Sequence, residues 1–191
     1  MKKSIEINET ERSLVPKNTL STIGYMTLFF FAYAFIGWLC ETCYAFYESG
    51  TFVKRGFLYG PICPIYGYGA LILLIFLEKY KDHPFRLFFL AGIVFSAFEY
   101  VVGFGLDALF AAKWWDYTNE FFNLNGRISI LFSVVWGTFA LLFINFVHPF
   151  IKKKIDGLLQ KVPAWLIKSI VPIFLITLIV DTILSSIKYL N

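Results

Sequence analysis

The sequence predicts an all-α, polytopic integral membrane protein with about five transmembrane helices. Three observations carry this prediction. Of the 191 residues, 58% are hydrophobic and only 16% are charged, whereas a soluble domain has about 25% charged residues. The mean hydropathy is +0.67. A chain of this length suits one membrane domain and leaves no room for a separate catalytic domain.

Five stretches are apolar over about the 20 residues that a helix needs to cross a bilayer. They run roughly over residues 23–47, 61–78, 85–112, 128–149 and 164–187. The first is too long for a signal-peptide core, and the third is long enough to tilt or to project beyond the bilayer. Residues 1–20 form a polar tail, and residues 21–191 form a single transmembrane domain.

The second stretch is short and opens within RGFLYGPICPIYGYG, a run rich in Gly and Pro. Such residues are tolerated at membrane depth only where the backbone meets protein or a water-filled cavity. We therefore expect a broken or re-entrant segment at this point of the chain. Pro163 sits at the first turn of the last stretch, where its missing N–H is not needed.

The Lys and Arg residues predict the orientation, because they are enriched in cytoplasmic loops. Twelve fall in the tail, in the 79–86 loop and in the 151–168 segment, and five fall on the other side. This places the N-terminus in the cytoplasm and the C-terminus outside. The loops at 48–61 and 113–127 then face outward.

Acids inside membrane spans are costly and usually face a cavity or a partner. Four lie within the predicted spans: Glu41, Glu99, Asp107 and Asp181. At 100° per residue, the third stretch has one face of small residues and acids, made of Gly92, Ser96, Glu99, Gly103 and Asp107. The first stretch has a similar face, made of Ala34, Gly37, Glu41, Ala45 and Glu48. Small residues let helices approach closely, so we expect these acids to meet inside the bundle.

The candidate counter-charges are Lys54, Arg55 and Arg127, and Asp181 is expected to pair with Lys188 or with a base from a loop. The planar guanidinium of an arginine suits a carboxylate or a phosphate. In the loop KWWDYTNEFFNLNGR, the aromatic residues are expected at the headgroups, with the polar residues turned inward. The expected substrate-binding residues are Glu41, Arg55, Tyr59, Tyr66, Glu99, Asp107, Trp115, Asp116, Tyr117, Asn123, Asn125 and Arg127. The structural alternative is that the ion pairs fix helix registry and the aromatic residues form an interfacial belt.

Several motifs are absent from the sequence. There is no GxxxxGK[ST], no GxSxG and no HExxH, so we expect no P-loop, no cofactor and no metal site. The Lys and Arg residues form no basic stripe, which argues against nucleic acid as a partner.

The three cysteines are expected to be small packing residues, although a Cys43–Cys63 bridge stays open. His83 and His148 each precede a proline and are expected to cap helices at the interface.

The runs GFLYGPICPIYGYGA and WWDYTNEFFNLNGRI, together with the HP at 148–149, resemble the bacterial "putative ABC-transporter type IV" membrane proteins. The resemblance covers about residues 25–150. It implies a permease subunit in the bacterial plasma membrane that works with a separate ATPase subunit. The lipid bilayer is an expected partner, and the sequence leaves open whether copies of the chain associate with one another. The cytoplasmic loops at 79–86 and 151–163 are short, which leaves little surface for an ATPase, although the second could form one small amphipathic helix over IDGLLQKV.

Three functions are compatible with these features. The first, which we favour, is a transport-related protein that binds a polar substrate in an outward cavity. The second is a membrane-embedded enzyme for a lipid-linked substrate, with Glu99 or Asp116 as general acid or base and Arg127 as a clamp. It ranks lower because the sequence has no recognised nucleophile. The third is a non-catalytic membrane scaffold.

Overall fold

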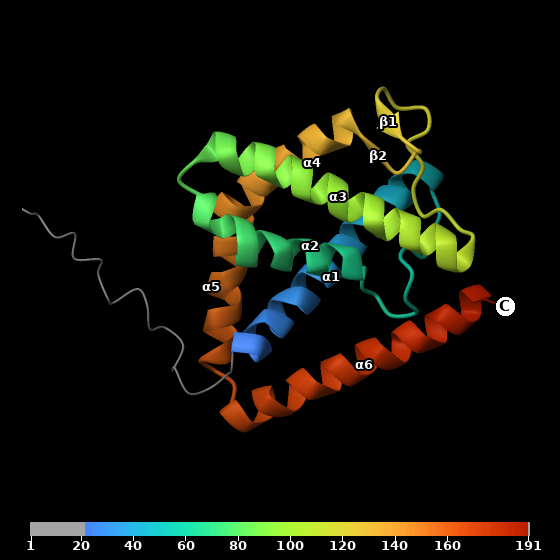
Figure 1. Ribbon diagram of the computed structural model, residues 1–191. Coiled ribbons are helices and arrows are strands. Elements are labelled where there is room, and N and C mark those ends of the chain that lie inside the picture. Colours follow the sequence, from blue (N-terminus) through green and yellow to red (C-terminus); the bar gives the residue numbers. More distant parts are fainter. Residues whose placement is uncertain (1–21, 191) are drawn as a thin grey trace, which may run out of the picture.

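The computed structural model describes residues 22–190, which fold into a bundle of helices with two very short strands (Figure 1). The helices are α1 (Thr22–Ser49), α2 (Pro64–Ile72), α3 (Pro84–Phe110), α4 (Ile130–Leu142), α5 (His148–Leu159) and α6 (Ala164–Leu190). The strands β1 (Asn123–Leu124) and β2 (Ile128–Ser129) pair in antiparallel fashion within one loop. The helical class is as predicted, and the tail predicted for residues 1–20 lies outside the described residues.

Four helices within residues 22–190 are long and apolar enough to cross a membrane. They are Thr22–Ser49, Pro84–Phe110, Ile130–Leu159 and Ala164–Leu190. The chain is therefore a multi-pass membrane protein. The remaining predicted span, 61–78, forms a shorter helical run in which α2 continues as a π-helical turn and a 3-10 turn, of 9, 5 and 3 residues. The count of five passes and the sides of the termini remain predictions.

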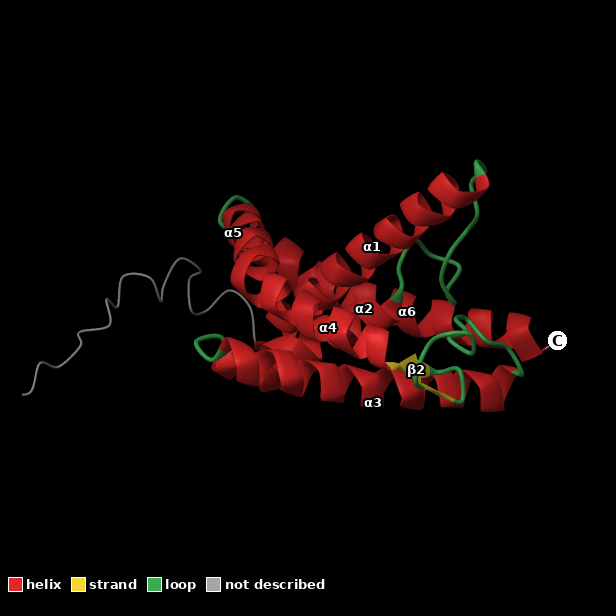
Figure 2. Ribbon diagram, turned by 90° about the horizontal axis from the view of Figure 1, so that it is seen from above, coloured by secondary structure: helices red, strands yellow, loops and turns green. Residues whose placement is uncertain are grey.

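The chain between α1 and α2 turns back along α1, as the green loop in Figure 2 shows. The amide of Cys63 donates a hydrogen bond of 2.9 Å to the carbonyl of Ala34. Ala34 precedes the end of α1 at Ser49 by 15 residues, which is about 22 Å of helix at 1.5 Å per residue. Residues 50–63 contain no helix or strand. The chain is therefore irregular and folds back along α1 at this point, as the Gly and Pro residues predicted, and its depth in the membrane remains a prediction.

Close backbone contacts hold α1 against α2. A Cβ atom on Gly37 would clash with the ring of Tyr66, and one on Gly67 would lie 2.6 Å from the ring of Phe30. Ala34, on the same face of α1, is fully buried. Small residues at these positions let the two antiparallel helices approach each other.

The predicted small-residue face of α3 packs against α4. The hydroxyls of Ser96 and Ser133 are 2.6 Å apart. A Cβ atom on Gly92 would lie 3.0 Å from the Ser133 carbonyl oxygen, and one on Gly137 would lie 2.7 Å from the Phe88 carbonyl oxygen. The small-residue face of α3 is therefore a close-packing face, as predicted, whereas its partner helix was not predicted.

The apolar core lies between these two helix pairs. Its buried residues come from α1, from the α2 run and from α3, α4 and the π-helical turn Phe143–Val147. They are Phe29, Tyr33, Ala70, Leu73, Leu74, Leu77, Leu87, Ala91, Phe95, Ala140, Phe143 and Ile144. Helix α6 contributes none of them, and only 6% of its most apolar window is buried. It runs along one side of the bundle (Figure 1).

The bundle has two distinct ends. At the loop end, the segments 50–63 and 111–129 meet the end of α6, where the ring of Tyr189 lies 5.2 Å from that of Phe57 and 5.3 Å from that of Trp114. The turn end has the start of α1 and the short connections at 81–83 and 160–163. The helix predicted to end at residue 149 continues to Leu159, so the Lys152–Lys154 segment is helical and not a loop.

Candidate functional site

Glu41 of α1 lies between a tyrosine and an arginine at the loop end. The hydroxyl of Tyr66 donates a hydrogen bond of 2.7 Å to Oε1 of Glu41. Its other oxygen, Oε2, is 3.7 Å from Nε of Arg55, and the two side chains are 30% and 43% exposed. The predicted pairing of Glu41 with Arg55 is therefore present. It is a long ion pair between two accessible groups, and such pairs contribute little stability.

Glu99 of α3 is the most deeply buried acid of the site, with 6% of its surface exposed. Its two oxygens accept hydrogen bonds from the Tyr117 hydroxyl at 2.9 Å and from the Trp136 indole N–H at 3.0 Å. Both donors are neutral. Among the ion pairs of residues 22–190, none includes Glu99.

These two acids belong to one constellation, which we call the carboxylate–tyrosine cluster: Glu41, Arg55, Tyr66, Glu99 and Tyr117. Tyr117 connects the two acids, because it bonds with Glu99 and lies close enough to Glu41 and Tyr66 to interact electrostatically with both. Burial, and then the nearby Glu99, raise the pKa of Tyr117. Tyr117 therefore remains protonated and keeps donating to Glu99 well above neutral pH.

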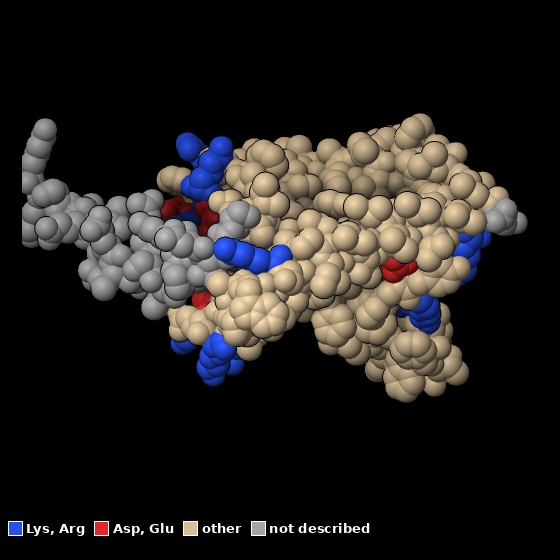
Figure 3. Space-filling view, turned by 90° about the horizontal axis from the view of Figure 1, so that it is seen from below, with Lys and Arg blue, Asp and Glu red and all other residues tan. Residues whose placement is uncertain are grey.

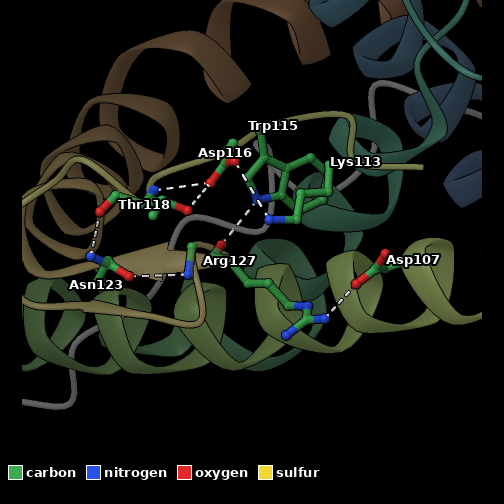
Figure 4. Close-up of polar contacts among 8 residues, drawn as sticks. Asp107, Lys113, Trp115, Asp116, Thr118, Asn123 and Arg127 are labelled. Atoms are coloured by element: carbon green, nitrogen blue, oxygen red, sulfur yellow. Dashed lines mark hydrogen bonds and ion pairs between the residues drawn. The ribbon is translucent and has the colours of Figure 1, made fainter. Parts of the chain in front are cut away.

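A second constellation, which we call the arginine cluster, lies along the last turns of α3 (Figure 4). It consists of Arg127, Asp107, Tyr100, Phe104 and Asn125. Nη2 of Arg127 is 2.6 Å from Oδ2 of Asp107, with the side chains 17% and 34% exposed. The guanidinium carbon lies 5.6 Å from the ring centre of Tyr100 and 5.5 Å from that of Phe104. The Asn125 amide donates to the Tyr100 hydroxyl at 3.0 Å. The predicted pairing of Arg127 with an intramembrane acid is present, and stacking on the rings holds the guanidinium in place.

The loop 111–129 is folded by its own hydrogen bonds. The indole of Trp115 donates to the Arg127 carbonyl at 2.9 Å, and the Tyr117 amide donates to the Gly126 carbonyl at 2.8 Å. The Asn123 side chain donates to two loop carbonyls at 3.0 and 2.9 Å and accepts from the Gly126 amide at 3.1 Å. Asn123 thus stabilises the loop and does not face the carboxylate–tyrosine cluster.

Asp116 also bonds within the loop. It accepts hydrogen bonds from the hydroxyl of Thr118 and, at 3.0 Å, from the amide of Thr118, and Nζ of Lys113 lies 3.5 Å away. The bond from the Thr118 hydroxyl is the main cause that lowers the pKa of Asp116, followed by the bond from the amide. Gly126 has φ +67°, and a Cβ atom there would lie 2.6 Å from Oδ1 of Asp116. A glycine is required because both the backbone angle and the space exclude a side chain.

Tyr59, the remaining predicted residue, is bound to α6. Its amide and that of Gly60 donate to the two oxygens of Asp181 at 2.8 and 2.7 Å, and the Ser185 hydroxyl donates to the same acid at 3.0 Å. Among the described ion pairs none includes Asp181. Its expected pairing with Lys188 or a loop base is therefore wrong, because backbone amides satisfy the carboxylate.

Sequence reasoning missed Trp136 and Tyr100, which complete the two clusters. A tryptophan or tyrosine inside an apolar helix needs a hydrogen-bond partner for its polar group. This requirement could have identified both residues from the sequence. It also missed polar pairs near the turn end. His148, expected at the interface, is 7% exposed and lies 2.9 Å from the Tyr33 hydroxyl. Asp156 is equally buried and bonds with Lys152 at 2.8 Å and with Tyr25.

The cysteines form no disulfide. Cys40, Cys43 and Cys63 are all free, and only Cys63 is buried. The alternative of a Cys43–Cys63 bridge is therefore not realised, and the expectation of buried packing residues holds for Cys63 alone.

Comparison with known proteins identifies a family. The model of a family described as "putative ABC-transporter type IV" matches residues 28–186, which includes both clusters and all six helices in whole or in part. No curated protein and no solved structure matches the chain significantly.

Proposed function

Because the chain belongs to the "putative ABC-transporter type IV" family, we propose that it is a permease-like transport protein of the bacterial plasma membrane. The proposed substrate site is the carboxylate–tyrosine cluster at the loop end, which opens to the outside under the predicted orientation. The single observation that carries this proposal is the position of Glu99, a buried acid with no basic partner among the described residues.

An ionised carboxylate in a low-dielectric interior costs several kcal/mol unless a charge and hydrogen bonds compensate it. Glu99 receives two hydrogen bonds from neutral groups and no counter-charge. Its stable states are therefore the protonated acid and a carboxylate next to a bound cation. Acids of this kind within membrane helices mark proton or substrate pathways.

The Glu41–Arg55 pair supplies the second half of the proposed site. At 3.7 Å and with both side chains partly exposed, a substrate can separate the pair at little cost. An anionic group of the substrate would bind the guanidinium of Arg55, which offers several donors in one plane. A cationic group would bind Glu41 or Glu99.

Arg127 has a different role in this proposal. Its guanidinium already bonds with Asp107 and stacks on two rings, so it holds the loop against α3 instead of receiving the substrate. An ATPase partner, as in other ABC transporters, would dock at the turn end, where α5 carries Lys152–Lys154.

Uptake of a metabolite mixture by proteoliposomes tests the site although the substrate is unidentified. Purified protein is reconstituted, incubated with a mixture of polar metabolites, washed and analysed by mass spectrometry, with any co-purified ATPase and ATP supplied. Metabolites retained by the wild type should be retained at least tenfold less by Glu99→Gln and by Arg55→Gln, while Lys113→Gln, outside both clusters, should behave as the wild type. Unchanged uptake by both folded variants would refute the proposed site.

A further inference from the structure

We propose that the space between α1, α5 and α6 binds one anionic phospholipid, with a hydrocarbon chain in the space and the phosphate at Lys54 and Lys188. This site shares no residue with the carboxylate–tyrosine cluster, so it stands independently of the proposed transport function.

The space is a cavity of about 570 Å³ with almost entirely apolar walls. It runs from the end of α5 to the loop end of α6. Its walls include Leu28, Phe31 and Phe35 of α1, Leu158 of α5, and Ile170 and Phe174 of α6. Apolar cavities do not hold ordered water. In a membrane the available apolar occupant is hydrocarbon.

The cavity cannot close, because α6 is fixed at both of its ends. At the loop end Asp181 bonds with the amides of Tyr59 and Gly60. At the turn end Ile167 is 3% exposed. Between them, one ring contact of 4.8 Å joins Phe31 to Phe174. Helix α6 therefore spans the gap beside α1 without filling it.

The dimensions favour a hydrocarbon chain over a helix of another subunit. The wall from Ile167 to Asp181 is about 21 Å long at 1.5 Å per residue. Spread over that length, the volume corresponds to a cross-section of about 27 Å². An α-helix with side chains is about 10–12 Å across and does not fit into this space. One extended hydrocarbon chain does.

The charge at the loop end favours an anionic headgroup. The Nζ atoms of Lys54 and Lys188 lie 5.7 and 5.2 Å from the ring centre of Tyr59, the neighbour of the cavity-lining Gly60. Within residues 22–190 neither lysine forms an ion pair, and Asp181 is engaged by backbone amides. Figure 3 shows that Lys and Arg on this face lie toward the two ends, with mostly uncharged surface and one acidic patch between them. The Lys54 ammonium also donates to the Leu58 carbonyl, and two ammonium groups outside any described ion pair attract a phosphate.

Native mass spectrometry tests the headgroup. The protein in mild detergent is titrated with phosphatidylglycerol and with phosphatidylcholine of the same chains. One phosphatidylglycerol should bind about tenfold more tightly or better, since each lysine near a charged headgroup contributes about fivefold. The double variant Lys54→Gln/Lys188→Gln should lose this preference, and Lys113→Gln should keep it. Equal binding of both lipids to the wild type, or a preference that survives the double variant, would overturn the proposal.

Two variants of the wall test the position of the chain. Ala32→Phe and Ile170→Trp each place a ring in the cavity, so each variant should lose the one tightly bound phosphatidylglycerol molecule. Ala108→Phe, on an exposed part of α3, is the matched control and should bind as the wild type. Gel filtration identifies variants that stay folded. A folded cavity variant that binds phosphatidylglycerol as the wild type does would show that the chain lies elsewhere.

Discussion

The hydroxyl of Tyr117 donates a hydrogen bond of 2.9 Å to Glu99, which ties the loop before α4 to the middle of α3. The second oxygen of the same carboxyl accepts from Trp136 of α4. Two helices and the loop between them therefore meet at one buried acid. This arrangement makes the acid both the centre of the proposed site and a determinant of the position of the loop.

Replacement of Tyr117 by phenylalanine isolates that hydrogen bond. The ring should stay stacked on Phe132, 4.1 Å away in the native protein, while Glu99 loses one of its two donors. We expect the free energy of unfolding to fall by about 1–2 kcal/mol, the usual cost of an unsatisfied buried acceptor. Denaturant titration in detergent measures this. Tyr47→Phe, at a position 86% exposed, is the control, and an equal effect of the two changes would contradict the role of the bond.

The pairing of α1 with α2 depends on the absence of a side chain at Gly37. Gly37→Ala places a methyl group against the ring of Tyr66 and should destabilise the protein by about 1–3 kcal/mol, as overpacking generally does. Gly105→Ala is a matched change in a helix where a Cβ atom meets nothing within 4 Å. It should stabilise by about 0.5–1 kcal/mol. Opposite shifts in melting temperature are expected, and shifts of the same sign would contradict the packing.

A double-mutant cycle measures the Asp107–Arg127 pair. Because the pair is short and partly buried, we expect a coupling energy of about 1–2 kcal/mol between Asp107→Asn and Arg127→Gln. The more exposed Lys113–Asp116 pair, with a distance of 3.5 Å, serves as the reference and should show no measurable coupling. The interpretation of Arg127 as the anchor of the loop fails if the two cycles agree.

The loop should respond to acid through Asp116. Hydrogen bonds from Thr118 lower the pKa of this carboxyl. The folded pKa is thus below the value of about 3.9 in the unfolded chain, so its contribution to loop order is present above that value. It is lost as the pH falls through the folded pKa. Thr118→Val should bring the pKa back toward its ordinary value, which carboxyl NMR of labelled aspartate detects. An unchanged pKa in this variant would assign the shift to another group.

Cysteine labelling tests the predicted orientation. In a background without Cys40, Cys43 and Cys63, a membrane-impermeant maleimide should label Asn119→Cys in intact cells. It should label Asp82→Cys only after permeabilisation. Both positions are exposed, one in the loop 111–129 and the other in the turn between the α2 run and α3. The reverse pattern would invert the topology and place the proposed site on the cytoplasmic side.

The helix faces were predictable from the sequence because helical periodicity does not depend on the partner. The arc from Gly92 to Asp107 does pack against α4 and the loop, with the Ser96–Ser133 hydrogen bond in its middle. The pairing of Glu41 and Asp107 with arginines followed from the high cost of a lone charge in hydrocarbon.

Other partners left no trace in the residue pattern. Asp181 is satisfied by the amides of Tyr59 and Gly60, and every residue type except proline carries such a donor. The contact of His148 with Tyr33 depends on the continuation of the α4 helix through a π-helical turn, Phe143–Val147. The three lysines that follow suggested a loop at this point, whereas the helix continues with those lysines exposed.

The return of residues 50–63 along α1 has a consequence for biosynthesis. Lipid offers no partners for the amides of this irregular segment, and two of them, those of Tyr59 and Gly60, bond with Asp181. The ribosome adds Asp181 more than a hundred residues later. The hairpin of α1 and α2 therefore cannot complete its hydrogen bonds when it leaves the translocon. It reaches its final position in the membrane only after α6 has been inserted.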